Sequence, residues 1–176
     1  MTTEVQLRAV VEQDLATFEA ALSSREGTGE FQWFGFTSFH GVRRRFAEDG
    51  LIGPDGGVLT VTCGGDCAGR VEWFPSAWGR PATSTCWTLA IAILPVWRGQ
   101  GIGTAAQALL VDHLFSSTRV ERVQAFTDVD NVPERRALER CGFTLEGVLR
   151  RAQWRDGGWH DQALYSVLRP KDPQVP

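Results

Sequence analysis

The 176-residue sequence has little of what membrane, secreted and nucleic-acid-binding proteins need. No run approaches the roughly 18 consecutive apolar residues of a membrane span. Residues 1–14 lack the long apolar stretch, behind a basic start, of a secretory signal peptide. The net charge of −3 gives no general attraction to nucleic acid or to an anionic membrane. We therefore expect a cytoplasmic protein without a membrane or nucleic-acid partner.

Groups that bind metals are also scarce. Cys63 and Cys67 lie close together, but none of the three histidines is near them and no second ligand pair follows, as it does at zinc sites. We expect no metal, and in a cytoplasmic protein we expect the four cysteines to be free thiols.

The length and composition fit one folded domain. With 43% hydrophobic and 22% charged residues, the chain is ordinary for a globular protein. Its length lies within the range of about 100–200 residues that is usual for one domain. We expect a single domain over residues 1–170 and a flexible C-terminal tail, KDPQVP, at residues 171–176.

The hydrophobic pattern predicts a mixed α/β chain. The expected elements are a strand at Val5–Val11, a helix at Glu12–Ser23, a hairpin of Val58–Thr62 and Gly69–Phe74, a strand at Cys86–Leu94, a helix of about four turns from Ile102, a strand at Val120–Thr127, a helix at Pro133–Cys141 and strands at Thr144–Arg150 and Gln162–Leu168. The mostly apolar run Cys86–Leu94 is typical of a central strand buried on both faces. Between Arg25 and Gly50 the pattern breaks down, and Pro75–Pro81 is predicted to be a loop.

The most informative segment is the turn RGQGIGT at Arg98–Thr104, between that buried strand and the following helix. Its glycines let a ligand approach the main chain, and the N–H groups and partial positive charge of the helix N-terminus suit a pyrophosphate. The Arg98 side chain either adds a charge-assisted contact or turns to solvent.

Four interpretations of this turn compete. A P-loop is excluded because no lysine is present, and the dinucleotide pattern G-x-G-x-x-G fails because Thr104 stands at its third glycine. The coenzyme A pyrophosphate pattern R/Q-x-x-G-x-G/A is satisfied by Arg98, Gly101 and Gly103. A tight turn without a ligand is the remaining interpretation.

A second segment, NVPERRALERCGF, begins at Asn131, and the strand EGVLR and the hairpin DGGWHDQALYSVL follow it. With the RGQGIG turn, these motifs have the order and the approximate spacing of the GNAT superfamily. Across Trp87–Leu168 the chain resembles that superfamily, in particular the ribosomal-protein N-acetyltransferases and their bacterial relatives. Upstream the resemblance is weaker and is carried by the aromatic segment Phe31–Phe34. It implies the α/β GNAT fold, with a mixed, mostly antiparallel central sheet splayed at the cofactor site and flanked by helices.

The resemblance also implies an acyl-CoA site. Main-chain groups of Ile91, Ala92 and Ile93 pair with the pantetheine arm, and Asn131 hydrogen-bonds the pantetheine or lies near the thioester. The main-chain amides that hold the pyrophosphate are those of Arg98, Gly99, Gln100, Gly101, Ile102, Gly103 and Thr104. The implied activity is transfer of an acetyl group, or another acyl group, from CoA to a primary amine of a small molecule or protein N-terminus, by direct attack in a ternary complex.

Three positions depart from the family's usual catalytic residues. Thr88 stands where many relatives carry a glutamate, Leu138 where many carry a tyrosine, and Glu134 where the ribosomal-type branch carries a serine. Glu134 and Glu72 are the catalytic candidates, although each is also typical of a solvated surface charge, and His40 is an alternative base. On the first turn of a helix, the dipole is expected to lower the pKa of Glu134 and leave it as a base.

The acceptor wall is expected at Phe31–Phe46. Trp33, Phe34 and Phe36 either bind an apolar substrate or fill the core. The run Arg43–Arg45 either attracts an anionic acceptor or RNA, or is a solvated helix face.

Other hypotheses remain. The three departures favour a catalytically degenerate CoA-binding sensor or scaffold. The arginine run favours a donor other than CoA, such as an aminoacyl-tRNA or a carrier-protein thioester. Trp78 and Trp97 are candidates for a homodimer interface.

Overall fold

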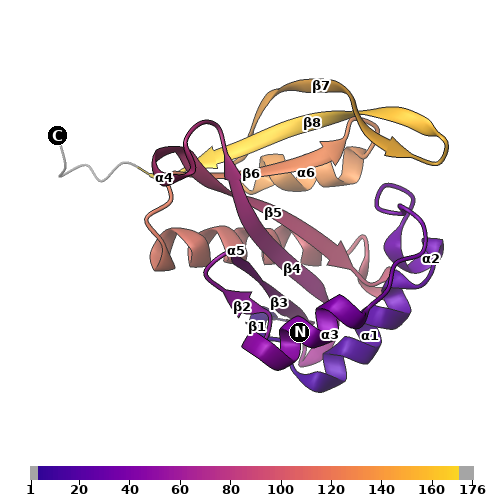
Figure 1. Ribbon diagram of the computed structural model, residues 1–176. Helices are drawn as coiled ribbons and strands as arrows, with labels where there is room; N and C mark the ends of the chain where they lie inside the picture. The colour runs from indigo at the N-terminus through magenta and orange to yellow at the C-terminus, as the bar shows by residue number, and fades with distance from the viewer. Residues whose placement is uncertain (1–3, 171–176) are drawn as a thin grey trace.

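The computed structural model describes residues 4–170 (Figure 1), so the tail predicted at residues 171–176 lies outside the described residues. Its elements are β1 (Val5–Ala9), α1 (Glu12–Leu22), α2 (Arg25–Thr28), α3 (His40–Asp49), β2 (Ile52–Gly53), β3 (Gly56–Cys63), β4 (Asp66–Ala77), α4 (Pro81–Ser84), β5 (Thr85–Ile93), the 3₁₀ turn η1 (Pro95–Trp97), α5 (Ile102–Ser117), β6 (Arg122–Asp128), α6 (Val132–Arg140), β7 (Thr144–Arg155) and β8 (Gly158–Leu168). Within residues 4–170, no helix is long and apolar enough to cross a membrane.

One sheet runs through the whole molecule. Its strand order is β1-β3-β4-β5-β6-β8-β7, with β2 paired to β3. Each pair is antiparallel except β5 and β6, which run parallel. The prediction of a mixed, mostly antiparallel sheet flanked by helices is therefore confirmed.

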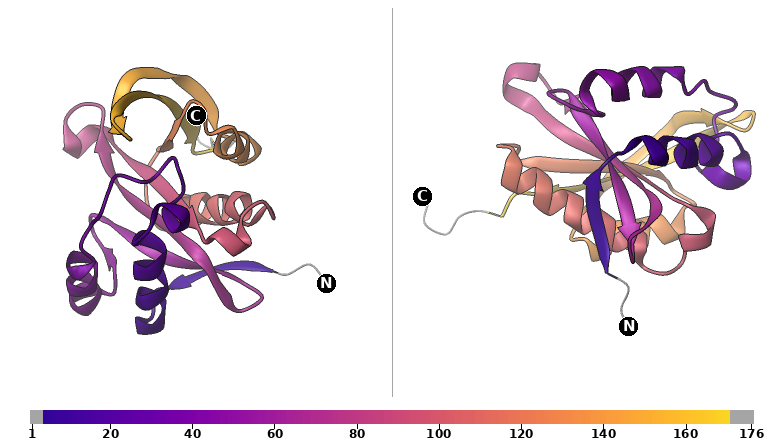
Figure 2. Two further views of the ribbon diagram at one scale, coloured as in Figure 1. Left: turned by 90° about the vertical axis from the view of Figure 1, so that its right-hand side faces the viewer. Right: turned by 90° about the horizontal axis from the view of Figure 1, so that it is seen from below.

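Helices cover both faces of this sheet. Figure 2 shows α5 and α6 on one face and α1 and α3 on the other. The larger core lies under α5, where Ala106, Leu110 and Leu114 are fully buried against the central strands. A smaller core holds α1 and α3 and includes Leu15 and Phe18. The central strands β5 and β6, between these two layers of helices, carry the site described below.

Three regions differ from the sequence prediction. The last hairpin is longer, because β7 runs to Arg155 and β8 begins at Gly158, beyond the predicted ends at Arg150 and Gln162. β4 continues through Pro75 to Ala77, where a loop was expected. The register of β3 on β4 ends at Trp73, so Pro75 lies where β4 has no β3 neighbour and a missing N–H costs no ladder bond. In the region without a clear pattern, α3 forms although none of its ten residues is buried. The buried Phe39 and the half-buried Phe46 hold it on the smaller core.

Candidate active site

The site is built on a fork between β5 and β6. The two strands are paired only at Trp87 with Val123 and at Thr88 with Gln124. Beyond Thr88, the remainder of β5 and the remainder of β6 separate. This parallel splay is the feature that the GNAT resemblance predicts at the cofactor site.

Thr88 lies at the end of the fork where β5 and β6 are still paired, and its side chain makes hydrogen bonds there. Its side chain is 2% exposed, and its Oγ1 lies 2.7 Å from Ser76 Oγ and accepts a hydrogen bond from Gln124 Nε2 at 3.0 Å. Gln124 in turn accepts from Trp78 Nε1 at 2.8 Å. The position where many relatives carry a glutamate therefore holds a buried hydroxyl that joins β5 to both β4 and β6.

Two cavities meet at the fork. The turn cavity, about 710 Å³, lies beside the glycine turn and is lined by residues 28–32, 91–93, 97–99, 101, 103–104, 131–134, 136–137 and 140. The aromatic cavity, about 680 Å³, is lined by residues 28, 31–35, 37–39, 42, 70, 72, 74, 89–92, 125–128, 131, 134, 153 and 162. Both are lined by Asn131 and Glu134 from α6, by Ile91 and Ala92 from β5, and by Gln32. A ligand in one cavity can therefore meet a ligand in the other at this junction.

The glycine turn presents its main chain to the turn cavity. Gly99 and Gly101 have φ values of 74° and 79°, a conformation that favours glycine. A Cβ atom at either position would meet nothing within 4 Å, so the side of the turn that these positions face is open. Gly101 is the N-cap of α5, whose first N–H groups carry the partial positive charge of the helix.

The exposed Arg98 side chain binds main-chain carbonyl groups of two neighbouring segments. Its guanidinium donates to the carbonyl oxygens of Ile93 at 2.8 Å, of Gly27 at 2.5 Å and of Glu26 at 3.4 Å. It therefore fastens α2 to the end of β5, while Arg98 also lines the turn cavity.

The open edge of β5 is partly occupied by side chains. Gln32 Nε2 donates to the Ile91 carbonyl oxygen at 2.9 Å, and Arg98 Nε donates to the Ile93 carbonyl oxygen at 2.8 Å. These contacts show that the carbonyls of Ile91 and Ile93 face away from β4 and into the fork. That edge is where the resemblance expects a pantetheine arm.

Asn131 caps α6. Its Oδ1 accepts from the Glu134 N–H at 3.3 Å, and its own N–H donates to the Asp128 carbonyl oxygen at 3.0 Å. The side chain is half-buried at the junction of the two cavities. Its cap role fixes its orientation, so its amide group is held at the place where both cavities end.

Glu134 lies on the first turn of α6, lines both cavities and is half-buried. Burial raises the pKa of its carboxyl to about 7, and the adjacent amide of Gln107 offsets part of that rise. The contact is loose, because neither amide atom of the fully buried Gln107 makes a hydrogen bond of ordinary geometry with a described group. The prediction of a lowered pKa is therefore wrong, since loss of solvent outweighs the helix N-terminus.

The other catalytic candidates lie further from this junction. Glu72 on β4 lines the aromatic cavity, with its Oε1 4.0 Å from Nη2 of Arg70. His40 is exposed, contacts Ser38 at 3.0 Å and lines neither cavity. Leu138 is fully buried in the larger core, so no proton donor stands in place of the family's tyrosine.

Only some of the predicted acceptor residues line a cavity. Trp33 and Phe34 line the aromatic cavity. Phe36, 90% exposed, lines neither cavity and packs edge-on against Trp33 with 5.4 Å between ring centroids. Arg43 pairs with Glu19 of α1 at 2.6 Å and also lies outside both cavities, which favours the interpretation of Arg43–Arg45 as a solvated helix face.

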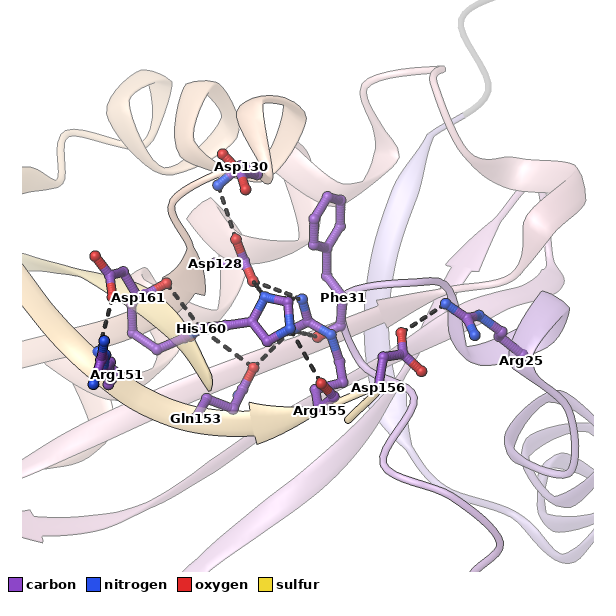
Figure 3. A network of polar contacts seen from close by, with 11 residues as sticks. Arg25, Phe31, Asp128, Asp130, Arg151, Gln153, Arg155, Asp156, His160 and Asp161 are labelled. Carbon is purple, nitrogen blue, oxygen red and sulfur yellow. Dashed lines mark hydrogen bonds and ion pairs between the residues drawn. The ribbon is translucent and has the colours of Figure 1, made fainter. Parts of the chain in front are cut away.

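A polar network beside the aromatic cavity was not predicted (Figure 3). Arg155 of β7 donates from Nη2 to Asp128 Oδ2 at 2.6 Å and from Nη1 to the Phe31 carbonyl oxygen at 3.2 Å and to Gln153 Oε1 at 2.8 Å. His160 Nδ1 lies 3.3 Å from Asp128 Oδ2. Burial alone would raise the pKa of Asp128, but the hydrogen bonds and charge of Arg155 outweigh it and lower that pKa.

Phe74 and Phe126 are further lining residues that sequence reasoning missed. A signal for them exists in the strand pattern, because alternate residues of a strand share a face. Phe74 follows Glu72 by two positions, and Phe126 precedes Asp128 by two. Phe74 therefore shares a face of its strand with the candidate Glu72, and Phe126 shares one with Asp128 of the polar network.

Comparison with known proteins agrees with the fold and with the splay of β5 and β6. Residues 4–144 match the acetyltransferase (GNAT) domain family, and the chain belongs to this family. A probable N-acetyltransferase of Bacillus subtilis, YjcK, is 36% identical over 76 residues. That alignment covers 43% of this chain and 42% of the relative, less than half of the relative's length.

Solved structures show the same fold over nearly the whole chain. Spermidine N-acetyltransferase from Vibrio cholerae, in complex with CoA and spermine, has a TM-score of 0.78 at 20% identity and is matched over 93% of this chain and 95% of its own. Mycobacterium smegmatis RimJ, in complex with CoA-disulfide, has a TM-score of 0.77 at 24% identity, over 97% of this chain and 84% of its own. The resemblance to the GNAT superfamily is thus confirmed.

Proposed function

We propose that the protein is an N-acyltransferase that moves an acetyl group, or another acyl group, from CoA to a primary amine. The observation that carries this proposal is the junction of the two cavities at the β5–β6 fork, with Glu134 lining both. One cavity, beside the N-terminus of α5, suits an anionic, extended donor, and the other, lined by aromatic and polar side chains, suits the acceptor. The two neighbouring folds that were crystallised with CoA support the choice of donor.

The donor would bind through main-chain groups. N–H groups of the turn from Gly99 to Thr104, at the N-terminus of α5, would take the pyrophosphate. The open edge of β5 at Ile91 and Ile93 would pair with the amides of the pantetheine arm. Arg136 and Arg140, which line the turn cavity, would add positive charge for the phosphates. This arrangement brings the thioester toward Asn131 and Glu134.

Chemistry would follow at the junction. The amine enters from the aromatic cavity, and the Glu134 carboxylate accepts its proton. The nitrogen forms a bond to the thioester carbonyl carbon, the carbon–sulfur bond breaks, and the leaving sulfur takes a proton to become the CoA thiol. A carboxyl whose pKa is about 7 can both accept and return a proton near neutral pH. Glu72, which lines the aromatic cavity from β4, is the second candidate for the base.

Release of free CoA thiol tests this function. The protein is incubated with acetyl-CoA and a broad panel of primary amines, and thiol appearance is followed with and without each amine. We expect amine-dependent thiol release together with acylated amine in equal amounts. Glu134→Gln is expected to lower kcat by about 10²–10⁴-fold, the usual contribution of a positioned acid or base. Thiol release that does not depend on any amine would contradict the proposal.

A CoA-binding protein without transferase activity is the second candidate. It is favoured by Thr88 and Leu138, which are buried and held in structural contacts where relatives carry catalytic groups. The same assay separates the two functions, because this candidate predicts tight acetyl-CoA binding and no acylated product with any amine of the panel.

A further inference from the structure

The aromatic cavity gathers exposed aromatic side chains from separate parts of the chain. Phe34 comes from the segment after α2, Phe74 from β4 and Phe126 from β6, with exposed fractions of 58%, 44% and 41%. Single exposed apolar residues are common on protein surfaces, but several around one hollow mark a binding site. These three rings present apolar surface to whatever fills the cavity.

The carboxylate of Asp128, which lines the cavity, is paired with an arginine. Asp128 and Arg155 are paired at 2.6 Å, and their side chains are 1% and 4% exposed. His160 and the Asp130 N–H, which donates to Asp128 Oδ1 at 2.9 Å, complete its contacts (Figure 3). A buried carboxylate with this many partners is not available to a second cation.

The remaining charges are few. Glu72 stands 4.0 Å from Arg70, whose side chain is 16% exposed and also lines the cavity. Glu134 is the only other carboxyl among the described lining residues, and the proposed reaction uses it. A polyamine carries several ammonium groups, and each one taken out of water needs its own partner. For a second ammonium group the cavity offers Glu72, with the positive charge of Arg70 beside it.

The cavity is also closed on one side by contacts between distant segments. Arg155 donates to the Phe31 carbonyl oxygen, and Arg25 of α2 pairs with Asp156 at the β7–β8 turn at 2.6 Å (Figure 3). These contacts tie the segment that carries Phe31 and Phe34 to the hairpin across the fork. The space of about 680 Å³ that they bound suits a compact molecule better than an extended polypeptide.

From this geometry we infer that the acceptor is a small primary monoamine whose body is aromatic or bulky and apolar. The inference rests on the proposed function and specifies its acceptor. The rings of Phe74 and Phe126 hold the apolar body, and the amine points to the junction at Glu134. The acceptor class differs from the spermine that is bound to the Vibrio cholerae enzyme of similar fold.

Steady-state kinetics at saturating acetyl-CoA test the inference with four probes: 2-phenylethylamine, tryptamine, spermine and a short peptide with an N-terminal alanine. We expect kcat/KM for the two aromatic amines to exceed that for spermine and the peptide by at least about tenfold, as differences in apolar contact usually allow. Phe74→Ala and Phe126→Ala are each expected to raise KM for 2-phenylethylamine about five- to twentyfold, because a lost aromatic contact weakens binding by this order. The Kd for acetyl-CoA should stay unchanged.

Two controls keep the test decisive. Leu168→Ala removes an apolar side chain that is 62% exposed and lies outside both cavities, and should change neither constant. Phe126→Leu keeps the apolar volume if the alanine variant fails to fold, and thermal melting reports on folding in each case.

Three results would overturn the inferred acceptor class: spermine or the peptide at least as good as the aromatic amines, KM unchanged in both phenylalanine variants, or acetyl-CoA bound with none of the four probes acylated. Absence of acetyl-CoA binding, or acylation of none of the amines in the broad panel, would instead contradict the proposed function itself.

Discussion

The side-chain amide of Gln32 donates a hydrogen bond to the main-chain carbonyl oxygen of Ile91, with 2.9 Å between the two atoms. This bond joins the aromatic segment to the edge of β5 that opens into the fork. Under the proposed function, the pantetheine arm pairs with the same edge. Donor binding therefore has to break or share this bond, which links the donor site to the wall of the acceptor cavity.

Replacement of Gln32 should therefore tighten donor binding. In Gln32→Ala the Ile91 carbonyl is free, and the net contribution of one hydrogen bond corresponds to a Kd for acetyl-CoA lower by about two- to tenfold. Calorimetric titration measures the change. Ser116→Ala is the control, because Ser116 Oγ donates to the His113 carbonyl oxygen at 3.0 Å, outside both cavities. Weaker binding in Gln32→Ala would show that Gln32 holds the donor instead of competing with it.

The pH dependence of the rate should follow Glu134. If its carboxylate takes the amine's proton, kcat/KM rises with pH through an apparent pKa near 7, the value to which burial raises that of Glu134. Glu134→Gln should lose this rise as well as most of the activity, and Glu134→Asp should restore part of both. A pH profile of the residual activity in Glu134→Gln that keeps the same rise would assign it to another group.

The free energy of unfolding should also depend on pH through Glu134. Because burial raises the pKa of Glu134 from its usual 4.5, the folded protein binds this proton more tightly than the unfolded chain does. The contribution of Glu134 favours folding below about pH 4.5 and is lost as the pH rises to about 7. Urea unfolding at pH 5 and pH 8 should show wild type losing stability relative to Glu134→Gln at the higher pH. A constant difference between the two proteins would contradict the raised pKa.

The elements around the fork could be predicted from local sequence signals, whereas the fork itself was expected only from the resemblance to the GNAT superfamily. The glycines of Arg98–Thr104, the helical spacing after them and the Asn131 cap all lie within single segments, where local rules hold. The raised pKa of Glu134 could not be predicted, because it depends on burial beside Gln107 of another helix. The segment at residues 29–39 has no periodic pattern, and contacts such as Gln32 with Ile91 determine its place.

The pairing of Asp128 with Arg155 was also beyond sequence reasoning, since it joins β6 to the tip of the β7–β8 hairpin. Its contribution to the free energy of unfolding can be tested. Arg155→Met leaves Asp128 buried without its partner, and breaking a buried pair in this way costs about 3–5 kcal/mol. Arg25→Met breaks the more exposed pair with Asp156 and should cost at most about 1 kcal/mol.

Urea unfolding of the two arginine variants measures this difference. Equal losses of unfolding free energy would mean that the buried pair contributes no more to stability than a surface pair does.

Donor binding at the fork is the central claim, and calorimetric titration with acetyl-CoA tests it most directly. Gly103 has no positive φ, and a Cβ there would make only ordinary contacts with Ile93 and Ile91 at 3.6 and 3.8 Å, so Gly103→Trp fills the turn cavity without straining the turn. Gly41→Trp on the exposed face of α3, where a Cβ meets nothing within 4 Å, is the control. We expect wild type and Gly41→Trp to bind acetyl-CoA with equal affinity and Gly103→Trp to lose binding. No binding by wild type, or full binding by a folded Gly103→Trp, would contradict a donor site at this fork.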